Sequence, residues 1–262
     1  MRYHKVPHAT DAGLGGRARI GLLVLKTDQT IEHEAREMLA GIDGVALHHA
    51  RLYNDAIISR DTLLAMKPLI PGAAALLPAE WGFTAIGYAC TSGAMVIGEA
   101  EVERLVRSEH PRSAVTNPVT ACLAAFRALA ARRIAVVTPY ARAVNDTIAA
   151  GLSARGLEVA AFASFEEPDD AIVGRITPAA VLAAARAAIS GVAVDAVFVS
   201  CTSLRLAAAI DGMEAALGVP VTSSNHATIW HLLRLAGIAD RIDGFGRLLR
   251  LGLAAAPAAA AE

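Results

Sequence analysis

The sequence predicts an α/β fold of two similar Rossmann-like lobes, each a four-stranded, largely parallel sheet flanked by helices, with the lobes related by pseudo-twofold symmetry. One observation is that short apolar runs alternate with segments of helical spacing along most of the 262 residues, the pattern typical of parallel sheets. The other is that this order occurs twice. Residues 19–24 resemble 133–138, and Cys90-Thr91-Ser92 resembles Cys201-Thr202-Ser203, at a nearly constant spacing.

The first repeat follows an N-terminal arm over residues 1–17 that has no periodicity. Strands are expected over 20–25, 45–49, 85–90 and 114–116, and helices over 29–40, 61–77, 94–108 and 118–130. Asp28 or Thr27 is a candidate N-cap of the first helix, and Pro118 stands in the first turn of the last one, where proline is favoured.

The second repeat has the same order. Strands are expected over 134–138, 158–162, 196–200 and 219–222, and helices over 141–154, 178–189, 204–217 and 225–236. We therefore assign residues 1–116 plus 223–262 to an N-terminal lobe that includes the C-terminal helix, and 117–222 to a second lobe. Ligands of parallel sheets bind beyond the carboxyl ends of the strands, so the active site is expected in the cleft between the lobes.

Composition excludes several classes of protein. The formal net charge is −1 with acids and bases interspersed, so no nucleic-acid partner is expected, because such proteins carry a basic patch. No apolar run reaches the roughly 18–20 residues of a membrane span, and residues 1–17 lack a signal-peptide core. Three cysteines indicate free thiols, and we expect a cytoplasmic protein.

Two cysteines are candidate catalytic groups because of where they stand. Cys90 and Cys201 each end an apolar strand and precede a helical segment, which places each thiol at a helix N-terminus that lowers its pKa from the usual value of about 8.5. Two thiols on opposite faces of one carbon can remove a proton from one side and return it from the other, which is racemisation without a cofactor. Cys122 lies within a helical segment and is interpreted as a core residue.

Motifs along nearly the whole chain resemble one known family. They are Ala89-Cys90-Thr91-Ser92, Val137-Thr138-Pro139-Tyr140, Ser200-Cys201-Thr202-Ser203, the run over 218–224 and Gly244-Phe245-Gly246-Arg247-Leu248. The chain resembles the aspartate/glutamate racemase superfamily, in the branch that contains maleate cis-trans isomerase, arylmalonate decarboxylase and the racemase-like proteins of ectoine-utilisation clusters.

The resemblance implies roles for individual residues. Cys90 and Cys201 match the two catalytic cysteines, and the decarboxylase branch lacks the first of them, so a racemase or isomerase is favoured. The resemblance further implies that four residues build the pocket for the substrate carboxylate and oxyanion: Thr91, Ser92, Tyr140 and Thr202.

Two positions depart from the family pattern. The resemblance implies that Asp28 stands where maleate isomerases have an asparagine that contacts substrate, and that Asp170 stands at the position of a second asparagine of the family. Additional carboxylates repel a dicarboxylate by a few kcal/mol where screening is poor, whereas they attract an ammonium group. We include both among the substrate-binding candidates, although Asp28 as a helix N-cap and Asp170 in a solvated turn are the alternatives.

The sequence therefore predicts a cofactor-independent two-cysteine racemase or isomerase of a small carboxylate, with an amino acid or ectoine-derived amino acid as the favoured substrate. One alternative is maleate cis-trans isomerisation, with Cys90 adding to the double bond; another is a non-catalytic sensor with the same cleft. No cofactor or metal site is expected. The resemblance implies a homodimer or higher homo-oligomer.

Overall fold

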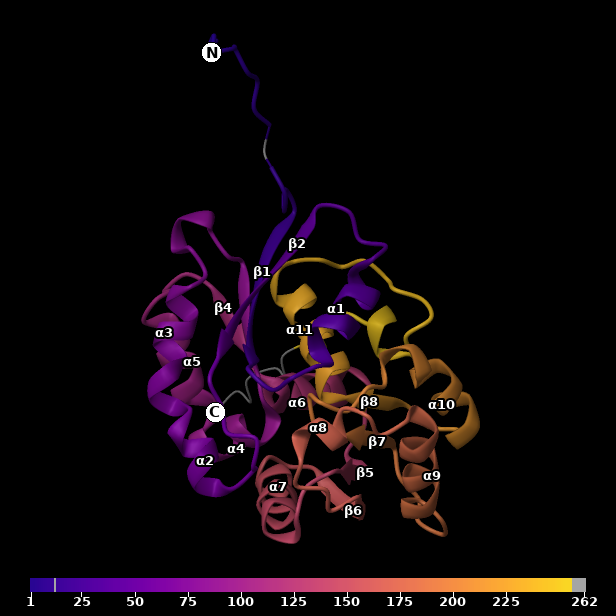
Figure 1. Cartoon of the computed structure of the whole chain (residues 1–262). Helices are drawn as coiled ribbons and strands as arrows, with labels where there is room; N and C mark the ends of the chain where they lie inside the picture. The colour runs from indigo at the N-terminus through magenta and orange to yellow at the C-terminus, as the bar shows by residue number, and fades with distance from the viewer. Residues whose placement is uncertain (12, 256–262) are drawn as a thin grey trace, which may run out of the picture.

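The computed structural model describes residues 1–11 and 13–255 and contains two four-stranded sheets (Figure 1). The sheet orders are β2-β1-β3-β4 and β6-β5-β7-β8, and every pairing is parallel. The strands are β1 (Ala18–Leu25), β2 (Val45–Leu52), β3 (Ala85–Ala89), β4 (Ala114–Thr116), β5 (Arg133–Thr138), β6 (Glu158–Ser164), β7 (Ala196–Val199) and β8 (Val221–Ser223). The predicted fold class is confirmed, because the second sheet repeats the order of the first.

Helices cover both sheets. The α-helices are α1 (Ile31–Leu39), α2 (Arg60–Ala65), α3 (Ile70–Ala75), α4 (Thr91–Ile97), α5 (Glu99–Arg107), α6 (Pro118–Ala128), α7 (Arg142–Ala154), α8 (Asp170–Val173), α9 (Pro178–Ala188), α10 (Ile210–Leu217) and α11 (Ser224–Leu235). Short 3₁₀ turns are η1 (Lys67–Leu69), η2 (Ala79–Trp81), η3 (Ala207–Ala209) and η4 (Leu248–Arg250).

Two predicted helices of the first lobe are broken. The helix expected over 61–77 divides into α2, η1 and α3, because Pro68 and Pro71 occupy first-turn positions of new segments and proline is not tolerated in a helix interior. The helix expected over 94–108 divides at Gly98, whose φ of 94° lies outside the helical region. The first of the resulting pieces, α4, starts directly after Cys90.

The core joins the two lobes. One cluster of buried apolar residues includes Ile20 and Leu22 of the first sheet together with Val136 and Phe198 of the second. Helix α11 contacts β3 and β4 as well as β8, so it lies against both sheets. The boundaries of the two lobes stay a prediction, and residues 256–262 of the N-terminal lobe assignment lie outside the described residues.

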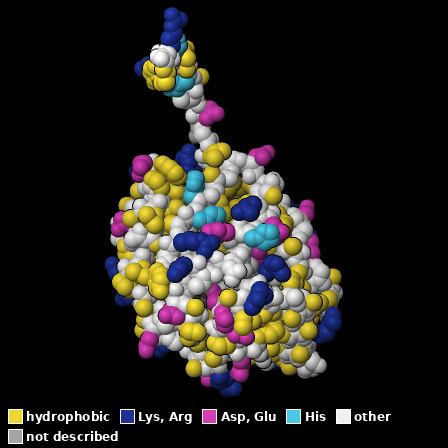
Figure 2. Space-filling view, in the orientation of Figure 1, with side chains coloured by type: hydrophobic (Ala, Val, Ile, Leu, Met, Phe, Trp, Pro, Cys, Tyr) yellow, Lys and Arg dark blue, Asp and Glu magenta, His cyan; other side chains and the backbone are white. Residues whose placement is uncertain are grey.

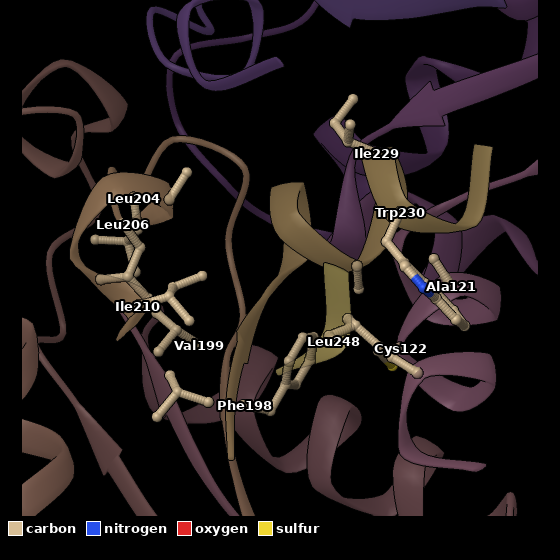
Figure 3. Packing of buried hydrophobic residues seen from close by; sticks show 14 of the residues in the cluster. Ala121, Cys122, Phe198, Val199, Leu204, Leu206, Ile210, Ile229, Trp230 and Leu248 are labelled. Carbon is tan, nitrogen blue, oxygen red and sulfur yellow. The ribbon is translucent and has the colours of Figure 1, made fainter. Parts of the chain in front are cut away.

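Cys122 belongs to this core. It is fully buried, and in Figure 3 it lies beside Ala121 of α6, close to Trp230 of α11 and Leu248. Its Sγ donates to the carbonyl oxygen of Val119 at 3.1 Å, which is a helix-internal bond. The interpretation of Cys122 as a core residue is confirmed.

The surface is mixed in character. Basic and acidic side chains are interspersed on the face shown in Figure 2, and the N-terminal arm projects away from the body. In the described part of this arm no residue is helical or in a strand before Ala18. Among the described residues, no helix is long and apolar enough to cross a membrane.

Candidate active site

A small cavity lies where the carboxyl ends of β3 and β7 meet. Its volume is about 30 Å³, enough for one or two water molecules, so a substrate enters only if its walls move apart. Both lobes contribute to the lining, which consists of Leu25, Asn54, Asp55, Ile57, Ile58, Thr62, Leu63, Met66, Cys90, Ser92, Tyr140, Asp170, Cys201, Thr202 and Ser203. The structure thus brings the two predicted cysteines into one cavity.

Cys90 follows β3, whose five residues are all buried, and it is the N-cap of α4. Its Sγ accepts a hydrogen bond from the backbone N–H of Gly93 at 3.2 Å and lies 3.8 Å from Ser92 Oγ. A Cβ at residue 93 would lie 3.0 Å from this sulfur and 2.6 Å from Tyr88 Oη, so only glycine allows the helix to approach the thiol this closely.

Cys201 has a different local structure. The helix predicted over 204–217 starts only at η3 and α10, so residues 201–206 form an irregular loop. The backbone N–H of Ser203 donates to Cys201 Sγ at 3.4 Å. The prediction of a helix N-terminus beside this thiol is wrong, because the turn after β7 is used instead to bind residues of the first lobe.

Both thiols are harder to ionise than the sequence predicts. Burial raises the pKa of Cys90 to about 11 and that of Cys201 to about 12, and the negative charges of Asp170 and Asp28 add to this rise. The amide hydrogen bonds act in the opposite direction but are outweighed, because a buried thiolate loses most of its hydration. Both cysteines are therefore neutral thiols at pH 7.

Tyr140 lines the same cavity as the two cysteines. Its hydroxyl interacts with the Cys201 thiol and with the Ser92 hydroxyl, and burial raises its pKa well above 10. Its backbone is held where β5 ends, since Asn145 Nδ2 and Ser164 Oγ both donate to its carbonyl oxygen, at 2.7 and 2.6 Å. A neutral phenol in this place is a hydrogen-bond donor for charge that develops near either sulfur.

Asp28 is buried and does not line the cavity. Its Oδ1 accepts from the backbone N–H groups of Thr30 and Ile31 at 2.8 and 2.9 Å, so it binds the backbone where α1 starts. The N-cap residue is Thr30, so the prediction of Asp28 or Thr27 as the N-cap is wrong by two or three residues. Its Oδ2 has no hydrogen-bond partner. Burial raises the pKa of Asp28 to about 6, although an interaction with Thr202 acts in the opposite direction. The predicted contact with substrate stays a prediction.

Asp170 does line the cavity and is only 6% exposed. It is the first residue of α8, with Asp169 as N-cap, and not part of a solvated turn. Its Oδ2 accepts from Thr27 Oγ1 and its Oδ1 from Ser203 Oγ, both at 2.6 Å. The carboxylate thus connects the turn after β1 with the turn after β7.

The three remaining predicted residues divide into two groups. Ser92 and Thr202 line the cavity, whereas Thr91 Oγ1 lies 2.7 Å from Ser224 Oγ at the start of α11 and is not part of the lining. The substrate-binding roles of all three stay predictions. Among the described residues, no group of three or more His, Cys, Asp or Glu side chains could hold a metal ion.

Sequence reasoning missed the residues that hold the Cys201 loop. Glu34, fully buried on α1, accepts from the backbone N–H groups of Leu206 and Ala207 and from Asn225 Nδ2. Asn225 Nδ2 also donates to the Thr202 carbonyl oxygen at 2.8 Å. A signal was present, since Glu34 falls on the apolar stripe of α1 that contains Ile31, Ala35 and Met38. A carboxylate on a buried face needs partners.

Comparison with known proteins gives a consistent result. The model of the arylmalonate decarboxylase family matches residues 20–249. A maleate isomerase of Nocardia farcinica is 31% identical over 248 residues, covering 90% of this chain and 96% of that protein. The arylmalonate decarboxylase of Bordetella bronchiseptica is 35% identical over 135 residues, covering 51% of this chain and 56% of that protein.

Solved structures agree with this. A Nocardia farcinica maleate cis-trans isomerase mutant, with serine for a cysteine and a covalently bound succinylcysteine intermediate, superposes with a TM-score of 0.81 at 29% identity, covering 89% of this chain and 98% of that one. A liganded double mutant of arylmalonate decarboxylase gives a TM-score of 0.79 at 26% identity, covering 88% and 98%.

Proposed function

Since this chain belongs to the arylmalonate decarboxylase family and is a cysteine-based isomerase like its maleate isomerase relatives, we propose that it racemises a small carboxylate that also carries nitrogen, an amino acid or a derivative of one. The observation that carries this proposal is a single cavity lined by two thiols and a buried carboxylate, Cys90, Cys201 and Asp170.

The two thiols divide the proton transfers. One cysteine, as thiolate, removes the α-proton, while the other, as thiol, donates its own proton to the opposite side of the same carbon. Cys90 is better suited to be the thiolate, because it is the N-cap of α4 and its Sγ accepts from the Gly93 N–H at 3.2 Å, whereas Cys201 lies in a loop that starts no helix and accepts from the Ser203 N–H at 3.4 Å. The roles reverse for the other enantiomer, so one thiol and one thiolate remain after each turnover.

Hydrogen-bond donors are available for the enediolate that forms when the α-proton leaves. Ser92, Thr202 and the neutral Tyr140 phenol all line the cavity. Donors that are already in place stabilise developing negative charge without reorganisation. Asp170 supplies the opposite charge, and a substrate ammonium matches it better than a second carboxylate does.

The test is a panel of aspartate, glutamate, diaminobutyrate derivatives, hydantoins and maleate incubated with the enzyme in deuterated buffer and followed by NMR. We expect deuterium at the α-carbon of a nitrogen-bearing acid, and the opposite enantiomer to appear with it. Cys90→Ala and Cys201→Ala are each expected to lower the rate by about 10²- to 10⁴-fold, the usual contribution of a general acid or base.

Cys122→Ala is the matched control, because this third cysteine lies in the core and outside the cavity; it should keep its activity. If every nitrogen-bearing acid stays unlabelled, the proposal fails. A ligand that binds the parent and both cysteine variants alike, without turnover of any compound, would indicate a sensor.

A second candidate is cis-trans isomerisation of maleate, which the similarity to maleate isomerases over most of the chain favours. In this reaction the Cys90 thiolate adds to one carbon of the double bond, the Cys201 thiol protonates the other, and rotation precedes elimination. Conversion of maleate to fumarate, with a Cys90 adduct seen by mass spectrometry in Cys201→Ala, would support this candidate.

A further inference from the structure

Asp170 is held from both lobes at the wall of the cavity. Its two oxygens accept from Thr27, which follows β1, and from Ser203, which follows β7. These bonds fix the position of the carboxylate relative to both cysteines. Asp170 is therefore a fixed charge inside the site and not a flexible side chain at its rim.

The direction of one of these bonds is determined by a third residue. Asn54 Nδ2 donates to Thr27 Oγ1 at 2.9 Å, and Asn54 Oδ1 accepts from the Thr27 backbone N–H at 3.1 Å. The Thr27 hydroxyl thus accepts from the amide, and its single proton is directed to Asp170 Oδ2. This oxygen is an acceptor, as an ionised carboxylate requires.

Asp170 lacks a counter-ion in the described part of the chain. None of the residues that line the cavity is Lys, Arg or His, and Asp170 takes part in none of the ion pairs among the described residues. A buried charge without an opposite charge is costly. The site is therefore electrostatically incomplete without a cation from outside.

The charge of Asp170 acts on both thiols. It raises the pKa of Cys90 and of Cys201, after burial as the larger cause. The other titratable groups that face the two sulfurs or line the cavity are neutral phenols or further acids: Asp28, Asp55, Tyr88 and Tyr140. None of them provides a positive charge that would cancel the effect of Asp170.

We propose that Asp170 binds the substrate's ammonium group, and that this ion pair makes Cys90 and Cys201 easier to ionise by cancelling the negative charge beside them. This inference rests on the proposed function, whose substrate carries the nitrogen. The substrate thereby assists ionisation of the base that acts on it, while carboxylates without an ammonium group leave the charge of Asp170 uncancelled.

The proton balance is simple. On binding of the ammonium, one thiol, Cys90 in one direction, releases its proton to solvent and becomes a thiolate. This thiolate takes the α-proton, and the Cys201 thiol donates its own proton to the other face. Cys90 is then a thiol and Cys201 a thiolate, and the number of protons in the site is the same as before the transfer.

The test measures thiolate formation without turnover. The ultraviolet absorbance of thiolates is followed against pH, with the Cys90→Ala/Cys201→Ala double variant subtracted as background. Methylammonium chloride is the probe, and sodium chloride at the same ionic strength is its control. We expect methylammonium to lower the midpoint of the parent's titration.

We also expect Asp170→Asn to lower the titration midpoint by about one pH unit or more without any ligand, since removal of a nearby like charge has effects of this size.

Two comparisons make the test specific. Asp170→Asn should no longer respond to methylammonium, whereas Asp55→Asn should titrate like the parent, because Asp55 lines the same cavity but is exposed to water. Circular dichroism checks that each variant is folded. The shift of the parent's titration by methylammonium is measured on the unsubstituted protein, so it does not depend on the folding of any variant. A parent titration that methylammonium does not move, or an Asp170→Asn midpoint equal to that of the parent, would overturn the proposal.

The result of this titration can be distinguished from the result of the deuterium experiment that tests the proposed function. An ammonium response without racemisation of any amino acid would support the role of Asp170 as an ammonium sensor and remove the proposed reaction. Racemisation without an ammonium response would support the reaction and remove the sensor.

Discussion

Single residues in this cavity have properties that their neighbours determine. Cys90 is the clearest case, since it is an N-cap, which favours a thiolate, and yet burial raises its pKa from 9.0 to about 11. Burial prevails because one amide hydrogen bond at 3.2 Å replaces only part of the hydration that the thiolate would have in water.

A first prediction concerns the reactivity of Cys90 towards iodoacetamide. At pH 8 a rise of two pKa units lowers the thiolate fraction about 100-fold, and the thiolate is the reactive form. We therefore expect the Cys90 peptide to be alkylated at least about 100-fold more slowly in the native enzyme than in the urea-unfolded chain, as measured by mass spectrometry. Equal rates in the two states would contradict the assigned burial.

A second prediction concerns Asp28, whose pKa is raised by burial from 3.8 to about 6. The folded state binds its proton more tightly than the unfolded state does, so the associated stability is present below pH 3.8 and lost as the pH rises through 6. Asp28→Asn, which keeps a side-chain oxygen that can accept from the Thr30 and Ile31 backbone N–H groups, is expected to raise the free energy of unfolding at pH 7.5 by up to about 3 kcal/mol.

This gain should fade between pH 6 and pH 4, as urea denaturation at several pH values would show. Asp43→Asn is the control, because Asp43 is exposed and the change should have little effect at any pH. A stability difference for Asp28→Asn that does not depend on pH would show that the carboxyl charge is not its cause.

At the scale of elements, the site depends on where helices start and end. Residue 98 ends α4 and permits α5 to start in a new direction, with φ 94° and ψ 133°. Such a backbone conformation is essentially restricted to glycine. The start of α4 at Cys90 and its early end at Gly98 together explain why the predicted long helix is absent.

A third prediction tests this junction. Gly98→Ala adds a Cβ that meets nothing within 4 Å, so its cost comes from the backbone alone and should lower the free energy of unfolding by about 1–3 kcal/mol. Gly72→Ala is the matched control, since it also meets no atom within 4 Å, lies in α3 and has no positive φ. We expect it to be neutral or to stabilise by up to about 1 kcal/mol in urea denaturation. Equal effects of the two changes would contradict this account.

At the scale of the whole molecule, the two lobes share one core. The buried cluster contains strands of both sheets, and Glu34 of α1 binds the loop that follows Cys201. The lobes are thus joined by packing as well as by hydrogen bonds on the side where the thiols meet. Movement that admits substrate has to preserve this common core.

A fourth prediction follows for unfolding. Because the core is shared, we expect one cooperative transition in urea, with coincident curves from far-ultraviolet circular dichroism and from tryptophan fluorescence. Trp81→Phe leaves Trp230, fully buried on α11, as the single reporter of the contact between the lobes. A fluorescence transition that precedes the loss of secondary structure would show that the lobes unfold separately.

Much of this protein follows from local sequence patterns. Apolar runs alternating with helical spacing determine the α/β class, and the repeated order determines two equivalent sheets. The position of Cys90 and Cys201 after equivalent strands of the two sheets places each thiol beyond the carboxyl end of its own sheet, where ligands of parallel sheets bind. Short-range chemistry was sufficient for these features.

The tertiary structure alone decided the state and the surroundings of the two thiols. No local pattern indicates that α10 begins late or that Thr27 and Ser203 direct their hydroxyls to Asp170. The apolar stripe of α1 indicates that Glu34 needs partners, but not that these partners lie in the loop after Cys201. Nor does any local pattern indicate that burial raises the pKa of Cys90 by more than the hydrogen bond from the Gly93 amide lowers it. The physical reason is the same in each case: desolvation and charge interactions depend on groups that are distant in the chain and become neighbours only in the fold.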